Sequence, residues 1–137
     1  MKHQEKVAYL KALIYIAMVD DTIEEGERLY FEQIGTLYGL SEDDITEIEE
    51  SIIERKESIE DILKGITERS TKLTLLYELL ALCYADNSYT LAESNSMKDI
   101  CRIMGIEDSK LVELENVMEE NLLLQKKINI ILERQEG

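Results

Sequence analysis

Apolar residues recur along this chain at alternating spacings of three and four, which places them on one side of a helix. The pattern predicts helices over about 4–19, 24–38, 42–57, 59–67, 71–85, 90–104 and 108–134, with a break near Asn121 as an open alternative in the last. Two stripes are the most regular: Leu10, Leu13, Ile14 and Ala17, and Leu76, Leu79, Leu80 and Cys83. The simplest core packs these two stripes against each other, with the remaining helices around them.

The chain repeats itself. The segment that starts at Ala17 aligns without a gap on the segment that starts at Cys83, an offset of 66 residues. Identical residues then coincide, namely Asp20 with Asp86, Glu27 with Glu93 and Gly39 with Gly105. We therefore expect a single domain, residues 1–137, made of two tandem pseudo-symmetric helical units, at about 4–67 and 71–134.

Signals for helix boundaries agree with these units. Thr90 with Glu93 is typical of a capping box, in which each side chain binds the other residue's backbone N–H. Gly39 and Gly105 each follow an amphipathic stretch and fit the left-handed residue that ends a helix. Ser41 is expected to begin the next helix of the first unit.

Composition supports an all-α bundle of about seven or eight helices. Proline and tryptophan are absent, and 45% of the residues are hydrophobic, so nothing interrupts long helices and a sizeable core is expected. The longest uninterrupted apolar run, 12–19, is too short to span a membrane, and no cleavage site follows it. Two widely spaced cysteines, Cys83 and Cys101, fit buried free thiols, and the cytoplasm is the expected compartment.

The charge is strongly negative and unevenly distributed. The net charge is −15, and residues 20–61 hold 16 of the 30 acidic side chains with only Arg28, Arg55 and Lys56 to balance them. This region would repel nucleic acid, whereas it suits a cation or the basic surface of a partner protein. A solvated, solubilising helix face is the alternative interpretation.

The repeated turns carry a recognisable motif. Residues 19–23 followed by Glu27, and residues 85–89 followed by Glu93, resemble the motif of TerB-like proteins, in which an Ala-Asp-Gly turn precedes a hydrophobic residue and a glutamate. Asp21 and Asn87 replace the glycine, and both residue types tolerate a left-handed backbone. The resemblance covers nearly the whole chain and extends to the N-terminal domain of DjlA-type co-chaperones, although the His-Pro-Asp triplet of a J-domain is absent.

The resemblance implies a stress or tellurite-resistance role and a site for a divalent cation such as calcium, magnesium or manganese. The candidate ligands are the oxygen-bearing residues of the two turns: Asp20, Asp21, Glu24, Glu27, Asp86, Asn87 and Glu93. A standard EF-hand is excluded, because apolar residues (Ile16 and Met18, Leu82 and Tyr84) occupy its first ligand positions. The alternative is that these acids only cap helices and close turns.

Catalytic constellations are missing from the sequence. His3 is the only histidine, so no histidine-based triad or zinc site can be assembled, and there is no glycine-rich phosphate loop. Residues 105–111 are similar to the Asp-Ser-Leu neighbourhood of acyl carrier proteins, but Lys110 replaces the leucine that follows Ser109. An acyl carrier is therefore the remote alternative.

These observations predict a non-enzymatic module that binds a divalent cation, a protein partner or both through its repeated acidic loops. The alternative is an adaptor without a metal site, which would use the acidic face together with exposed members of the tyrosine set (Tyr9, Tyr15, Tyr30, Tyr38, Tyr77, Tyr84 and Tyr89). The apolar segment Leu122–Leu132 also suggests a homodimer.

Overall fold

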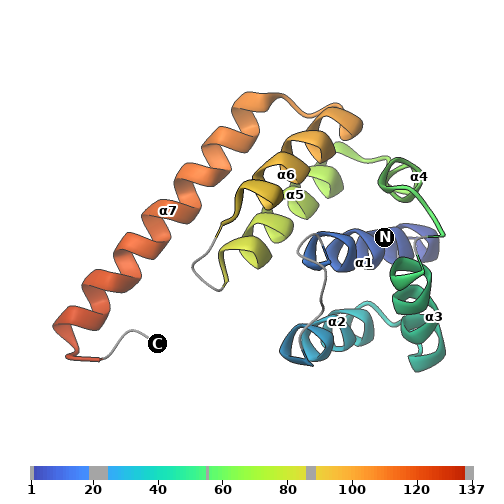
Figure 1. The fold of residues 1–137 in the computed structure, drawn as a ribbon, viewed down its shortest axis with the longest axis horizontal. Helices are drawn as coiled ribbons and strands as arrows, with labels where there is room; N and C mark the ends of the chain where they lie inside the picture. Colours follow the sequence, from blue (N-terminus) through green and yellow to red (C-terminus); the bar gives the residue numbers. More distant parts are fainter. Residues whose placement is uncertain (1, 19–24, 55, 86–88, 135–137) are drawn as a thin grey trace.

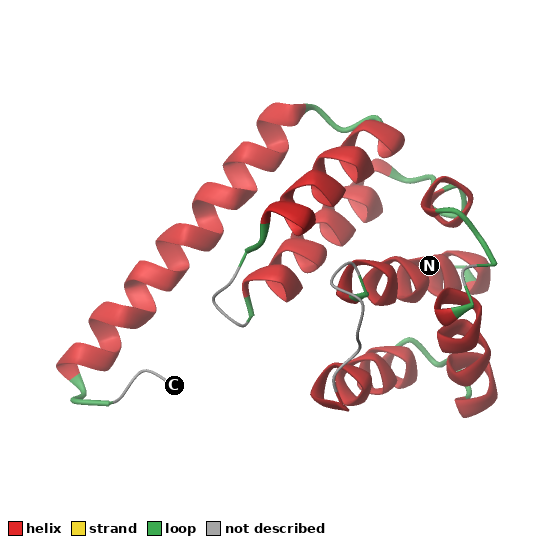
Figure 2. Ribbon diagram, in the orientation of Figure 1, coloured by secondary structure: helices red, strands yellow, loops and turns green. Residues whose placement is uncertain are grey.

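The computed structural model describes residues 2–18, 25–54, 56–85 and 89–134. They form α1 (His3–Ala17), α2 (Glu25–Leu37), α3 (Glu42–Ile53), α4 (Ile59–Leu63), α5 (Arg69–Tyr84), α6 (Leu91–Met104) and α7 (Asp108–Ile131). Within these ranges every regular element is a helix (Figure 2), which confirms the predicted all-α class. None of the described helices is both long and apolar enough to cross a membrane.

Short polar residues begin the helices where the sequence predicts them. Thr90 and Glu93 form the expected capping box, and Ser41 forms another with Asp44 at the start of α3. Gly39 and Gly105 have φ angles of 80° and 70°, so both adopt the left-handed conformation that a side chain would strain.

Helices α1 and α5 pack against each other at the centre of the molecule, as the two stripes predict. Helix α1 also contacts α2, α3 and α4, whereas α5 contacts α6 and α7, so each central helix joins its own group of helices (Figure 1). The largest side chains of the two stripes are fully buried; these are Leu10, Leu13, Ile14, Leu76, Leu79 and Leu80. Ala17 is only partly buried, because α1 ends there.

The offset of 66 residues reappears in the helix boundaries. It places His3 on Arg69, Glu25 on Leu91 and Glu42 on Asp108, which are the first residues of α1 and α5, α2 and α6, and α3 and α7. The units differ after this point, because α3 ends at Ile53 whereas α7 continues to Ile131.

Several predicted boundaries are corrected by the structure. Helix α7 continues through Asn121 without the break considered above, since no proline or glycine interrupts it and the Asn121 side chain is exposed. Helices α3 and α4 end four residues earlier than expected, at Ile53 and Leu63, and both ends are followed by turns that bring α4 back onto α1.

Replacing Gly35 with alanine is expected to destabilise the fold by about 1–2 kcal/mol, because small-to-large changes strain a packed core. A Cβ atom at Gly35 would lie 2.7 Å from Ile45 Cδ1 and 3.3 Å from Leu10 Cδ2. Gly26→Ala in the same helix is the control, since nothing lies within 4 Å of its Cβ position and alanine favours helices. Urea denaturation of both variants measures the difference; equal stability would contradict this account of the α1–α2–α3 packing.

Candidate functional site

The structure describes only two of the candidate metal ligands. Asp20, Asp21, Glu24, Asp86 and Asn87 lie outside the described residues. Glu27 and Glu93 lie in the first turns of α2 and α6, at equivalent places in the two units, and both are partly buried. Within the described ranges no three acidic, histidine or cysteine side chains are placed to hold a metal ion.

Glu93 already has a structural role. Its Oε1 atom accepts a hydrogen bond of 2.9 Å from the Thr90 backbone N–H, and its own N–H donates to Thr90 Oγ1 at 3.1 Å. One carboxylate oxygen is thus used to begin α6, as the alternative interpretation of these acids requires. Only the other oxygen would be available to an ion, and calcium or magnesium needs about six oxygen ligands.

Two tyrosines fix the second turn to α7. The Tyr89 hydroxyl donates a hydrogen bond of 2.9 Å to Glu115 Oε2, and the Tyr84 and Tyr89 rings stack with their centroids 4.7 Å apart. Burial, and then the hydrogen bond to Glu115, raises the pKa of Tyr89 above its ordinary value. The phenol therefore stays protonated and remains a hydrogen-bond donor at every physiological pH.

Glu49 of α3 is the repeat equivalent of Glu115, but its environment differs. One of its oxygens, Oε1, is buried without a hydrogen bond, and Oε2 lies 4.0 Å from Arg28 Nε. Burial raises the pKa of the Glu49 carboxyl, Arg28 opposes this shift, and the charge of Glu32 adds to it. The identity of Glu49 and Glu115 at the offset of 66 residues would have revealed this pair in the sequence.

A cluster of tyrosines surrounds a second partly buried acid, Glu78 of α5. The Tyr9 hydroxyl and Glu78 Oε2 are both buried without a hydrogen bond of ordinary length, and the Tyr9 and Tyr38 rings meet edge to face at 5.6 Å. Burial, and then Glu78, raises the pKa values of Tyr9, Tyr30 and Tyr38. These tyrosines lie between α1, α2 and α5 and do not form an outer docking surface.

The expected aromatic docking set is therefore largely absent from the surface. Among the seven tyrosines Tyr77 is the exposed one, at 47%, whereas Tyr9 and Tyr84 are buried and the others are partly buried. Aromatic residues at helical spacing are more often packing residues than contacts for a partner, and this chain follows that rule.

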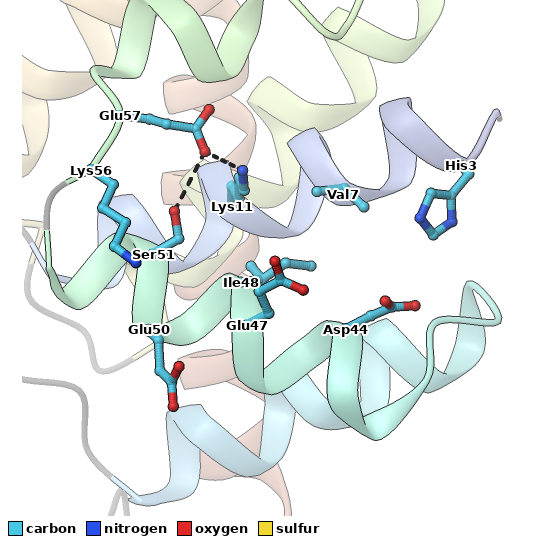
Figure 3. Close-up of a pocket in the computed structure, with 10 residues that line it drawn as sticks. All are labelled: His3, Val7, Lys11, Asp44, Glu47, Ile48, Glu50, Ser51, Lys56 and Glu57. Carbon is cyan, nitrogen blue, oxygen red and sulfur yellow. Dashed lines mark hydrogen bonds and ion pairs between the residues drawn. The ribbon is translucent and has the colours of Figure 1, made fainter.

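A cavity of about 370 Å³ opens between α1 and α3 (Figure 3). It is lined by His3, Val7, Lys11, Asp44, Glu47, Ile48, Glu50, Ser51, Lys56 and Glu57. Lys11 forms an ion pair with Glu57 at one end, and Lys56 pairs with Glu54 at 3.0 Å, so both cations near the cavity have carboxylate partners.

The remaining charge in this cavity is negative. Helix α3 contributes Asp44, Glu47 and Glu50 to the lining, and its 12 residues include no basic side chain. Glu47 and Glu50 are exposed, so their carboxylates are available to a ligand. The second unit lacks this feature, because Lys110 and Asn116 stand at the positions equivalent to Asp44 and Glu50.

Both the helix order and the repeated turns define an all-α protein of seven described helices in the TerB-like class. Residues 6–116 match the family described as tellurite resistance protein TerB, and the chain belongs to this family. No curated protein matches the chain.

A solved structure with the same fold is a tellurite resistance protein from Nostoc punctiforme. The TM-score is 0.66 at 18% sequence identity, and the match covers 100% of this chain and 86% of the other. At this identity the likeness establishes the fold.

The two equivalent glutamates are expected to respond oppositely to neutralisation. A carboxyl whose pKa is raised by folding stabilises the fold while it is protonated and loses that contribution as the pH rises above its ordinary value of 4.5. Glu49→Gln should therefore melt at a higher temperature than the parent at pH 7, with the difference closing as the pH falls toward 4.5.

Glu115→Gln is the matched control. It replaces the charged acceptor of the Tyr89 hydroxyl, so it should lose about 1 kcal/mol at pH 7. Thermal melts of both variants across this pH range test the contrast, and a loss of stability in Glu49→Gln at pH 7 would disprove it.

Proposed function

We propose that this TerB-family chain is a non-catalytic binding module that holds a basic segment of a protein partner against the acidic face of α3. The observation that supports this proposal is the α1–α3 cavity, whose two lysines are already paired while Asp44, Glu47 and Glu50 line it without basic partners on their own helix. A lysine or arginine side chain complements such a lining in charge and length.

The acidic face also suits rapid recognition. The net charge of −15 attracts a basic partner over a Debye length, so association should be fast and should weaken as salt is added. A non-catalytic role agrees with the single histidine in the sequence and with the tyrosines, which are held protonated by burial.

Binding of a fluorescent lysine- and arginine-rich peptide, measured by anisotropy, tests this proposal. Glu47→Gln/Glu50→Gln removes two exposed carboxylates from the cavity and should weaken binding by about three- to tenfold. The control Glu60→Gln/Glu119→Gln removes the same charge from exposed positions on α4 and α7, and it should retain nearly parental affinity. Equal weakening in both variants would reduce the interaction to general electrostatics and contradict the proposed site.

A divalent cation bound by the repeated turns is the second candidate function. It is favoured by the equivalent placement of Glu27 and Glu93 at two helix starts, each next to the other acids of its turn. We infer a composite oxygen-ligand site made of Asp20, Asp21, Glu24, Glu27, Asp86, Asn87 and Glu93.

Calorimetric titration with calcium, magnesium and manganese tests this second candidate. The parent should show saturable heat and gain about 2.7 kcal/mol of stability at a hundredfold excess over the dissociation constant. Asp20→Ala/Asp86→Ala should lose both effects, whereas Asp43→Ala/Glu119→Ala, which removes two exposed acids elsewhere, should keep them. Heat that is absent from the parent, or that survives in the first variant, removes the metal site.

A further inference from the structure

The second unit lacks a helix that folds back, and its sequence explains why. In the first unit Ser58 caps α4, its side chain accepting from the Asp61 N–H, and α4 then packs on α1. The equivalent of Ser58 is Leu124, which cannot cap a helix, and the equivalents of Lys56 and Glu57 are Leu122 and Leu123. Helix α7 consequently runs on where the first unit turns.

This continuation leaves the end of α7 without a neighbour in the described chain. Leu122 is the last α7 residue that packs on the core, and the C-terminal end of α7 projects away from the other helices (Figure 1). Large apolar side chains are exposed there: Leu123 (55%), Leu124 (53%), Ile130 (74%), Ile131 (76%) and Leu132 (56%). A helix that is apolar on nearly every side is normally buried.

Part of this apolar surface has the spacing of a helix-pairing seam. Residues at alternating intervals of three and four form one stripe along α7: Leu114, Val117, Asn121, Leu124, Ile128 and Ile131. The stripe lies beside the face that packs on α5 and α6, since Leu111 and Met118 are the fully buried residues of α7. The seam can therefore pair without disturbing the core.

The charges along α7 indicate which occupant fits. The first half carries Asp108, Glu113, Glu115, Glu119 and Glu120, whereas the stretch after Asn121 carries Lys126 and Lys127 and no acid before the helix ends. An antiparallel second copy brings the acidic half of each α7 beside the basic stretch of the other. Glu120 and Lys127 flank the seam on the same side, so each can face the other's counterpart in the partner.

We propose that two copies of this chain pair through antiparallel α7 helices. Asn121 of each copy lies across from Leu124 of the other, Val117 across from Ile128, and Leu114 across from Ile131, with Glu120 opposite Lys127 on each side. The pairing buries the apolar end of α7 and places the two acidic bodies at opposite ends of the dimer.

A parallel pair fits less well. It would let the two Asn121 amides meet, but it would bring together the acidic halves of both helices and place Lys127 beside Leu132 instead of a carboxylate. The two bodies, each part of a chain of net charge −15, would also lie side by side.

Sedimentation equilibrium of the full chain tests the pairing. The parent should sediment at twice the chain mass of 15.9 kDa, with reversible dissociation on dilution. Leu124→Glu and, separately, Ile131→Glu should sediment as monomers with unchanged far-ultraviolet circular dichroism. Leu37→Glu and Leu91→Glu change side chains that are as exposed, on α2 and α6, and should remain dimeric. A parent that stays monomeric up to its solubility limit overturns the proposal.

Charge exchange tests the antiparallel register. Glu120→Lys and Lys127→Glu each place like charges opposite one another twice in the dimer, so each should weaken self-association by about tenfold. An equimolar mixture of the two variants should form heterodimers of parental affinity, because every facing pair is then opposite in sign. The double variant Glu120→Lys/Lys127→Glu should recover likewise. Failure of both to recover overturns the antiparallel arrangement, whatever the mass of the parent.

Discussion

The burial of α1 is the constraint on which the rest of this structure depends. This helix contacts α2, α3, α4 and α5, so it has almost no face left for water. Small residues make the close contacts possible: Ala8 approaches Gly65 so closely that a Cβ there would lie 2.8 Å from its own, and Ala12 is fully buried. The one long polar side chain in its middle, Lys11, reaches the edge of α3 and pairs with Glu57.

Duplication explains the architecture, and divergence between the two units explains where the proposed functions lie. The shared features are structural: helix starts, the positive-φ glycines and the central apolar stripes recur at one offset. The acidic cavity exists only in the first unit, since Lys110 and Asn116 replace two of its acids in the second. The projecting helix exists only in the second unit, since Leu124 replaces the cap at Ser58.

Membership of the TerB family covers the two units but not the projecting helix. The family match ends at residue 116, which lies in α7 before most of the apolar seam. The acidic cavity and the repeated turns lie within the matched residues. The proposed binding role and the proposed pairing therefore concern different parts of the chain, and they can succeed or fail independently.

The sequence by itself determined the helical class, the repeat, the capping boxes and the left-handed glycines, because these depend on residues close together in the chain. It also indicated the two central stripes, since a periodic apolar face must be buried. Periodicity could not reveal that Tyr9, Tyr30 and Tyr38 turn inward around Glu78, or that Glu49 is buried without a hydrogen bond. Only the tertiary structure decided these points, together with the α1–α3 cavity and the free end of α7, because each depends on which distant helix covers a side chain.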